Sequence, residues 1–340
     1  MMGSRGATSH RRARWALTSI TAGALAAAFS IVGPGVTSSG ASSAPGSSTT
    51  STTSTLPTSS TTTTTTSTLP PSTTTTVTPA IGYLVIGASA SQGMQPTGIV
   101  GHNGAYTKTG YANDVVTQEA TKGVALVLKQ IGCPGETPES VLDGTDKCPR
   151  IGRQLAAATT YLSAHAAEPV LVSIDLGFNN VRPCLTTPIV NVACAKKGIA
   201  TVALDLPKLL TVLKERASSQ TRFVGLTYED AFLGDYVHVG SGPTQAAASL
   251  VVMDELNQVL TKDYRAAGMS VANVLTVFAS HDTALVAFSG GTRVPQNVAN
   301  ACRWTWYCRA PPWGPDDHPN NTGYRMIAKA IVTAVGSWKG

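Results

Sequence analysis

The segment 81–93 reads IGYLVIGASASQG and joins a short apolar run to a serine turn flanked by glycines. A run of this length that ends at Gly87 is typical of a buried strand. The turn that follows presents Ser89 where its hydroxyl can be held exposed. The segment therefore predicts the first strand of a sheet, with a candidate nucleophile at the carboxyl end of that strand.

Four further apolar runs follow along the chain, and helical patterns separate them. We expect the other strands over residues 124–131, 169–176, 222–226 and 271–278. We expect helices over 154–165 and 201–218, a long helix opened by Ser241 and Pro243, and a last helix after Pro319. Strands that alternate with helices predict a parallel sheet covered on both faces. The expected class is α/β, a three-layer α/β/α flavodoxin-like fold with a five-stranded parallel sheet.

Three loops of the predicted sheet carry candidate site residues. In such sheets the ligand crevice lies beyond the carboxyl ends of the strands, where the strand order switches. If the first strand lies between the second and third, the loops with Ser89, Gly135 and Asn179 meet there. Gly135 can offer an unobstructed backbone N–H and Asn179 a side-chain N–H, and an oxyanion needs such donors.

An acid and a base stand close together before the last predicted helix. The stretch 316–320 reads DDHPN, and a nucleophilic serine needs both a base and an acid that orients it. Each piece alone is weak, because a Gly-Ala-Ser turn is usually a plain turn. Four pieces in one order at one sheet edge are much less expected by chance. We interpret Asp317 as a solvated residue rather than a catalytic one.

These blocks resemble those of the SGNH hydrolases, also called the GDSL esterase and lipase family. The similar stretches are YLVIGASASQG at 83–93, IGCPGET at 131–137, GFNN at 177–180 and VGLTYEDAFL at 224–233. The stretch at 131–137 is similar to the form common in secreted actinobacterial members. Asp316 with His318 matches the last block, since Pro315 stands at the other family position for the acid. Two positions depart, because Ala88 and Asn180 stand where the family has Asp.

The resemblance implies the SGNH hydrolase fold over about residues 81–336, and a catalytic assembly. Ser89 would be the nucleophile, His318 the base and Asp316 the acid. The N–H groups of Ser89 and Gly135 and the side chain of Asn179 would bind the oxyanion. From its place between Gly177 and Asn179, we expect Phe178 to contact the acyl group of the substrate. Such chemistry requires no metal and no organic cofactor.

We therefore expect a secreted serine esterase that hydrolyses carboxylic esters of an acyl lipid or an acetylated carbohydrate through an acyl-enzyme. The alternative is a catalytically inactive surface-binding protein that keeps the fold. The expected partner is a small-molecule, lipid or glycan ester, and the expected state is a monomer.

The first 79 residues differ from the rest in composition. They hold four of the 25 Lys and Arg residues and no acidic residue, so residues 80–340 are near +2 in charge. A nucleic-acid-binding role thereby loses its main support. Three arginines precede an apolar stretch near 15–32, which predicts a signal peptide or an N-terminal anchor over 1–41. This segment could associate the chain with a membrane or cell wall.

The segment between leader and folded part contains almost no side chains to bury. Residues 37–79 include 31 Ser or Thr among 43 and no charge. They cannot offset the entropy cost of ordering. We predict a disordered linker over 42–79 and a hydrolase domain over 80–340.

All six cysteines lie beyond residue 130, and an even count in an exported chain suggests disulfides. Fifteen pairings are possible, and we favour neighbours in the sequence. The favoured pairs are Cys133–Cys148, Cys184–Cys194 and Cys302–Cys308. A zinc site is the rival interpretation, but no Cys-x-x-Cys pair supports it.

Overall fold

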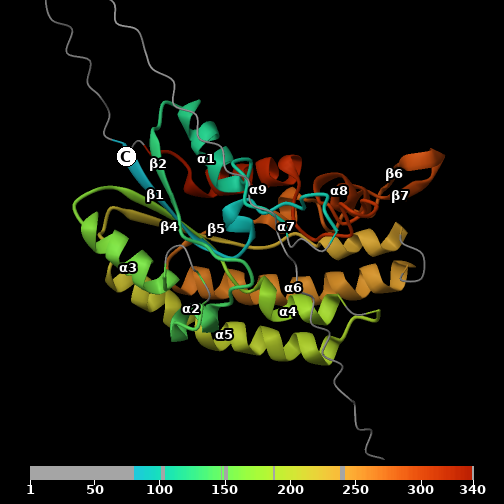
Figure 1. Ribbon diagram of the computed structural model, residues 1–340, viewed down its shortest axis with the longest axis horizontal. Helices are drawn as coiled ribbons and strands as arrows, with labels where there is room; N and C mark the ends of the chain where they lie inside the picture. Colours follow the sequence, from blue (N-terminus) through green and yellow to red (C-terminus); the bar gives the residue numbers. More distant parts are fainter. Residues whose placement is uncertain are drawn as a thin grey trace, which may run out of the picture. The chain divides into compact units, whose positions relative to one another are not determined.

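The computed structural model describes residues 80–338 except 101–103, 147, 149–151, 187 and 238–241. The predicted leader and linker lie outside the described residues, so the proposed domain limits remain predictions. A five-stranded sheet with the strand order β2-β1-β3-β4-β5 forms the centre of the described part (Figure 1). The strands are β1 (Ile81–Gly87), β2 (Leu126–Gln130), β3 (Val170–Asp175), β4 (Thr221–Leu226) and β5 (Ser270–Ala272).

The strand β1 lies between β2 and β3 and runs parallel to both. This is the arrangement that would bring three candidate loops together. Every residue of β1 and of β3 is buried, as expected for strands covered on both faces. The predicted parallel α/β architecture is therefore confirmed, and Gly87 stands opposite Asp175 at the carboxyl edge.

Helices cover both faces of the sheet. The helices of the described residues are α1 (Tyr111–Ala120), α2 (Pro138–Asp143), α3 (Gln154–Ala164), α4 (Phe178–Leu185), α5 (Val192–Glu215), α6 (Gly242–Ala266), α7 (Val274–Val277), α8 (Gln296–Trp304) and α9 (Asn321–Val335). Successive side chains of a strand point to opposite faces. Leu84 and Ile86 pack with α3, α5 and α6, whereas Tyr83 and Val85 pack with α1, α7 and α9. Figure 1 shows these two groups of helices on opposite sides of the sheet.

The expected fifth strand is only partly right. The apolar run 271–278 divides into the short strand β5 and the helix α7. Asn273 begins the helix, because its side chain accepts the N–H of Thr276 at 3.0 Å. The hydroxyl of Thr227 accepts the N–H of Val274 at 2.9 Å and so satisfies a second N–H of the first turn. Polar caps thus end the strand where hydrophobicity alone predicted that it would continue.

Two further elements differ from the sequence-based expectation. The helix expected from residue 201 begins at Val192, where the Asn191 side chain accepts the N–H of Cys194 at 3.0 Å. A small antiparallel hairpin, β6 (Leu285–Ala287) with β7 (Arg293–Pro295), was not predicted. Its three-residue strands are too short to show a period of two in the sequence.

The structure contains the three disulfides between sequence neighbours. Cys133–Cys148 tethers the loop after β2, and Cys184–Cys194 joins α4 to α5. Cys302–Cys308 joins α8 to the segment that leads toward Asp316. All six thiols are therefore used, and none remains as a thiolate ligand for the rival zinc site. Within the described residues, no helix has both the length and the apolar character needed to cross a bilayer.

Candidate active site

The carboxyl edge of β1, β2 and β3 borders a cleft of about 520 Å³. Ser89 lies two residues after the end of β1 and directly precedes the short 3₁₀ helix η1 (Ala90–Gln92). Gly135 lies in the loop after β2, and Asn179 lies in the first turn of α4, after β3. All three residues line the cleft, as do Phe178 and His318. The topology thus brings together the candidate residues expected from the sequence.

Hydrogen bonds to Asp175, the last residue of β3, hold the turn that carries Ser89. The Ala88 N–H donates to Asp175 Oδ1 at 3.2 Å and to the Asp175 carbonyl oxygen at 3.3 Å. Gly87 makes room for this carboxyl, because an added Cβ would lie 1.2 Å from Oδ1. Ala88 therefore contributes to the turn through its backbone, although it lacks the carboxylate of the family pattern.

Asp175 is 2 % exposed, and its environment favours the neutral acid. Burial raises the pKa of Asp175 well above its usual range, and the hydrogen bond from Ala88 offsets only part of this effect. The sequence contains a signal for this residue, namely an acid within the apolar run 169–176. Its role was missed, because only the structure shows that it meets Ala88.

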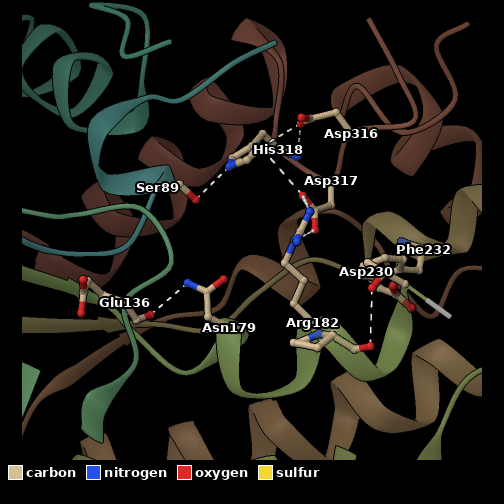
Figure 2. A network of polar contacts seen from close by, with 11 residues as sticks. Ser89, Glu136, Asn179, Arg182, Asp230, Phe232, Asp316, Asp317 and His318 are labelled. Carbon is tan, nitrogen blue, oxygen red and sulfur yellow. Dashed lines mark hydrogen bonds and ion pairs between the residues drawn. The ribbon is translucent and has the colours of Figure 1, made fainter. Parts of the chain in front are cut away.

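A continuous hydrogen-bonded chain links Ser89, His318 and Asp316 (Figure 2). Ser89 Oγ lies 2.8 Å from His318 Nε2, and Asp316 Oδ1 lies 2.8 Å from His318 Nδ1. The backbone N–H of His318 also donates to Asp316 Oδ1 at 2.9 Å. This is the geometry in which an imidazole, oriented by a carboxylate, can take a proton from a serine hydroxyl.

Opposing effects set the pKa of each ionisable partner in this chain. Burial would lower the pKa of His318, but the hydrogen bond and charge of Asp316, with the charge of Asp317, raise it above its ordinary value. Burial would raise the pKa of Asp316, but the hydrogen bonds and charge of His318 lower it overall. The pair therefore favours an ionised carboxylate and a basic imidazole.

The segment that carries His318 is held by backbone contacts on both sides. The Trp306 N–H donates to the His318 carbonyl oxygen at 3.0 Å, and the Asn320 N–H donates to the Trp304 carbonyl oxygen at 2.9 Å. The Asn320 side chain then begins α9 by accepting the N–H groups of Thr322 and Gly323. These contacts hold His318 just before α9, which packs on the sheet.

The expectation that Asp317 is solvated is wrong. Asp317 is 8 % exposed, and the guanidinium of Arg182 binds both of its carboxylate oxygens (Figure 2). Its Oδ1 atom also lies 3.8 Å from His318 Nδ1. The sequence could not show this pair, because Arg182 stands 135 residues earlier in α4 and no local pattern marks it.

Two of the donors expected for an oxyanion, Gly135 and Asn179, line the same cleft as Ser89. Gly135 has a φ of +81°, a conformation that side chains disfavour, and its residue is exposed. Asn179 Nδ2 donates to the Glu136 carbonyl oxygen at 2.9 Å, which joins α4 to the Gly135 loop (Figure 2). An amide nitrogen carries two hydrogens, so this bond leaves one for a ligand.

The part of the cleft wall formed by Phe178, Tyr228 and Glu229 is aromatic and acidic. Phe178 packs against Tyr228 and Phe232, with ring centroids at 5.4 and 6.2 Å. Glu229 lies in the same wall, and burial raises its pKa to about 7, with a smaller contribution from the charge of Asp317. Sequence reasoning predicted Phe178 here and did not single out Glu229.

Comparison with known proteins identifies the fold. No family model matches the chain, and no curated protein matches it in sequence. The solved extracellular lipase from Streptomyces rimosus matches with a TM-score of 0.52 and 20% identity, over 75% of this chain and 100% of that chain. Phospholipase A1 from Streptomyces albidoflavus NA297 matches with a TM-score of 0.51 and 17% identity, over the same shares. The expected resemblance to SGNH hydrolases is thereby confirmed at the level of the fold.

Proposed function

We propose that this chain, which has the SGNH hydrolase fold, hydrolyses carboxylic esters through an acyl-enzyme on Ser89. The observation that carries the proposal is the hydrogen-bonded chain from Asp316 through His318 to Ser89, which opens into the cleft. A serine, a base and an orienting acid recur on unrelated folds wherever acyl groups are transferred, so the geometry is more specific than the fold.

In the first half-reaction, Ser89 Oγ attacks the ester carbonyl carbon while His318 Nε2 takes the hydroxyl proton. The carbonyl oxygen becomes an oxyanion, which the N–H groups of Ser89 and Gly135 and the Asn179 amide can bind. His318 then gives the proton to the leaving alcohol. Asp316 holds the Nδ1–H of the imidazole throughout, at 2.8 Å.

In the second half-reaction, a water molecule attacks the acyl-enzyme carbonyl. His318 takes a proton from that water and returns it to Ser89 Oγ as the carboxylic acid leaves. The residues that we assign to both steps supply the acid, the base and the nucleophile. The mechanism therefore needs neither a metal nor an organic cofactor.

For the substrate we propose an ester of an acyl lipid or of an acetylated carbohydrate, with Phe178 beside the acyl group. Two of the solved structures that share this fold are a lipase and a phospholipase A1. Among the described residues that line the cleft, Arg182 is the only Lys or Arg, and Asp317 binds it. With Asp316 ionised as well, the cleft favours neutral esters over anionic ones.

The alternative is an inactive surface-binding protein with the same fold. Asp317, Asp316 and His318 are largely buried and form an ionic group with the more exposed Arg182, so the assembly of this group costs desolvation free energy. A protein that only binds a surface has no need for an imidazole aimed at a serine hydroxyl. The intact chain to Ser89 therefore favours catalysis.

We also propose that the chain acts outside the cytoplasm as a monomer, without a nucleic-acid partner. Three disulfides in the described part are typical of proteins that mature in an oxidising compartment. The predicted signal peptide or anchor would deliver the domain, and the predicted linker would separate it from a membrane or cell wall.

Nitrophenyl esters from acetyl to palmitoyl test the proposed activity, with Ser89→Ala as the control. Turnover that disappears in the variant supports the hydrolase. A preference for short chains would favour an esterase or deacetylase, and a preference for long chains would favour a lipase. A purified, folded protein with no turnover on any chain length would favour the inactive surface-binding alternative.

A further inference from the structure

Two carboxylates face the same nitrogen of His318. Asp316 Oδ1 accepts a hydrogen bond from Nδ1 at 2.8 Å, whereas Asp317 Oδ1 lies 3.8 Å from that atom. The longer distance is outside the range of a hydrogen bond, so Asp317 acts on the imidazole through its charge alone. The proposed mechanism uses only the first of these two acids.

Arg182 determines where the second carboxylate stands. Its Nε atom donates to Asp317 Oδ2 and its Nη2 atom donates to Asp317 Oδ1 at 3.3 Å. Two bonds from one planar group fix the carboxylate in orientation as well as in distance. The Asp317 side chain is 4% exposed, and such a buried charge requires a partner to remain ionised.

Arg182 and the proposed oxyanion donor come from the same helix. Asn179 and Arg182 are three residues apart in α4, and residues at this spacing share a helix face. One face of α4 therefore borders the cleft with a donor for the oxyanion and with a clamp for Asp317 (Figure 2). Both residues line the cleft, which ties the clamp to the site.

The charges around His318 oppose each other. Asp316 and Asp317 favour the protonated imidazole and Arg182 disfavours it. Glu229 lines the same cleft, and its carboxyl interacts electrostatically with His318. Without Arg182, Asp317 would be free to turn toward Nδ1 and compete with Asp316 for its proton. The guanidinium thus keeps Asp316 as the acceptor and limits the effect of the second charge.

We propose that Asp317 is a positioning residue that stabilises protonated His318 when Ser89 attacks, and that Arg182 sets the strength of this effect by clamping the carboxylate 3.8 Å away. The inference rests on the proposed hydrolase function. The proton moves from Ser89 to His318 Nε2, and Asp317 stays ionised throughout.

The pH dependence of kcat/KM tests this role with Asp317→Asn and Arg182→Met. His318 must be neutral to take a proton, so kcat/KM is lost as the pH falls through the pKa of His318. This loss of kcat/KM at low pH is the acidic limb of the pH profile. Asp317→Asn removes a charge that favours the imidazolium and should move the acidic limb to lower pH by about 1 unit. Arg182→Met removes the opposing charge and should move it to higher pH. The double variant should return close to the wild-type limb.

Two additions keep the test decisive. Arg182→Lys retains the charge and should keep the limb near its wild-type position, which a merely steric role of Arg182 does not require. NMR titration of the His318 ring in wild type and variants needs no turnover, so it separates failure of this inference from failure of the proposed function. If the ring titrates at the wild-type pH in both folded single variants, Asp317→Asn and Arg182→Met, the inference is overturned.

Discussion

His318 Nε2 lies 2.8 Å from Ser89 Oγ, although 229 positions separate the two residues in the sequence. Ser89 follows the strand β1, and His318 precedes the last helix, α9. The α9 helix packs in the same core as Tyr83 and Val85 of β1. The site is therefore assembled by the topology of the sheet rather than by any local segment.

Asp316→Asn should lower kcat by about 10⁴, as the equivalent change does in a serine protease. Its amide can present an N–H to His318 Nδ1 and so favour the wrong imidazole tautomer. We expect the exposed substitution Asp143→Asn, a matched control, to leave kcat unchanged. Steady-state kinetics on nitrophenyl acetate measures both, and a nearly normal Asp316→Asn enzyme would remove Asp316 from the assigned role.

Asn179→Ala should lower kcat by about 10²–10³, the usual effect of losing one oxyanion donor. The loss should fall on kcat more than on KM, because the oxyanion exists only after attack. The next residue provides the control, since Asn180→Ala removes an amide that we do not assign to the oxyanion. Equal losses in the two variants would mean that the effect is structural.

The bond Cys133–Cys148 should stabilise both the fold and the oxyanion loop. It spans 15 positions, for which loop closure predicts about 3 kcal/mol of unfolding free energy. Urea unfolding of the double variant Cys133→Ala/Cys148→Ala and of the wild type measures this difference in unfolding free energy. Because Gly135 is two residues from Cys133, kcat should fall further than in Cys184→Ala/Cys194→Ala. If the order of the two kcat losses is reversed, the disulfide does not support the loop.

Asp175→Asn should fold and label with a fluorophosphonate at nearly the wild-type rate, because an amide replaces a neutral buried acid that accepts the Ala88 N–H. Its effect on stability should depend on pH. In the wild type, the raised pKa of Asp175 contributes stability below about pH 3.9 that is lost as the pH rises toward the folded-state pKa, because only the unfolded chain then releases the proton.

The variant lacks this titrating group, so its unfolding free energy relative to wild type should increase between about pH 4 and about pH 8. Denaturant unfolding at the two values measures the difference. An unchanged difference would show that the carboxyl of Asp175 ionises normally in the folded protein.

Much of the fold could be predicted because buried strands carry an unambiguous signal. The run Ile81–Gly87 is apolar throughout its interior, and the order of strands and helices limits the sheet to few topologies. The end of the fifth strand could not be predicted in the same way. Asn273 and Thr227 redirect the chain there by hydrogen bonds, one of which joins residues 47 apart.

The predicted site residues were those whose chemistry has a local pattern. Ser89 stands in a glycine-flanked turn, and Asp316 stands two residues from His318. Arg182 has no such pattern, and its partner Asp317 resembled a surface residue because polar neighbours usually indicate solvent. Only the tertiary contact between α4 and the last loop shows that this carboxylate is buried.

The nucleophile is the central assignment, and fluorophosphonate labelling with peptide mapping tests it most directly. Ser91, the other serine of the turn, lies in η1, is fully buried and donates to the Ala88 carbonyl oxygen at 2.6 Å, so it cannot reach an ester in the cleft. We predict that the label is found on Ser89, that it persists in Ser91→Ala and that it is absent from Ser89→Ala. Label on Ser91, or label that remains in Ser89→Ala, would contradict the proposed acyl-enzyme.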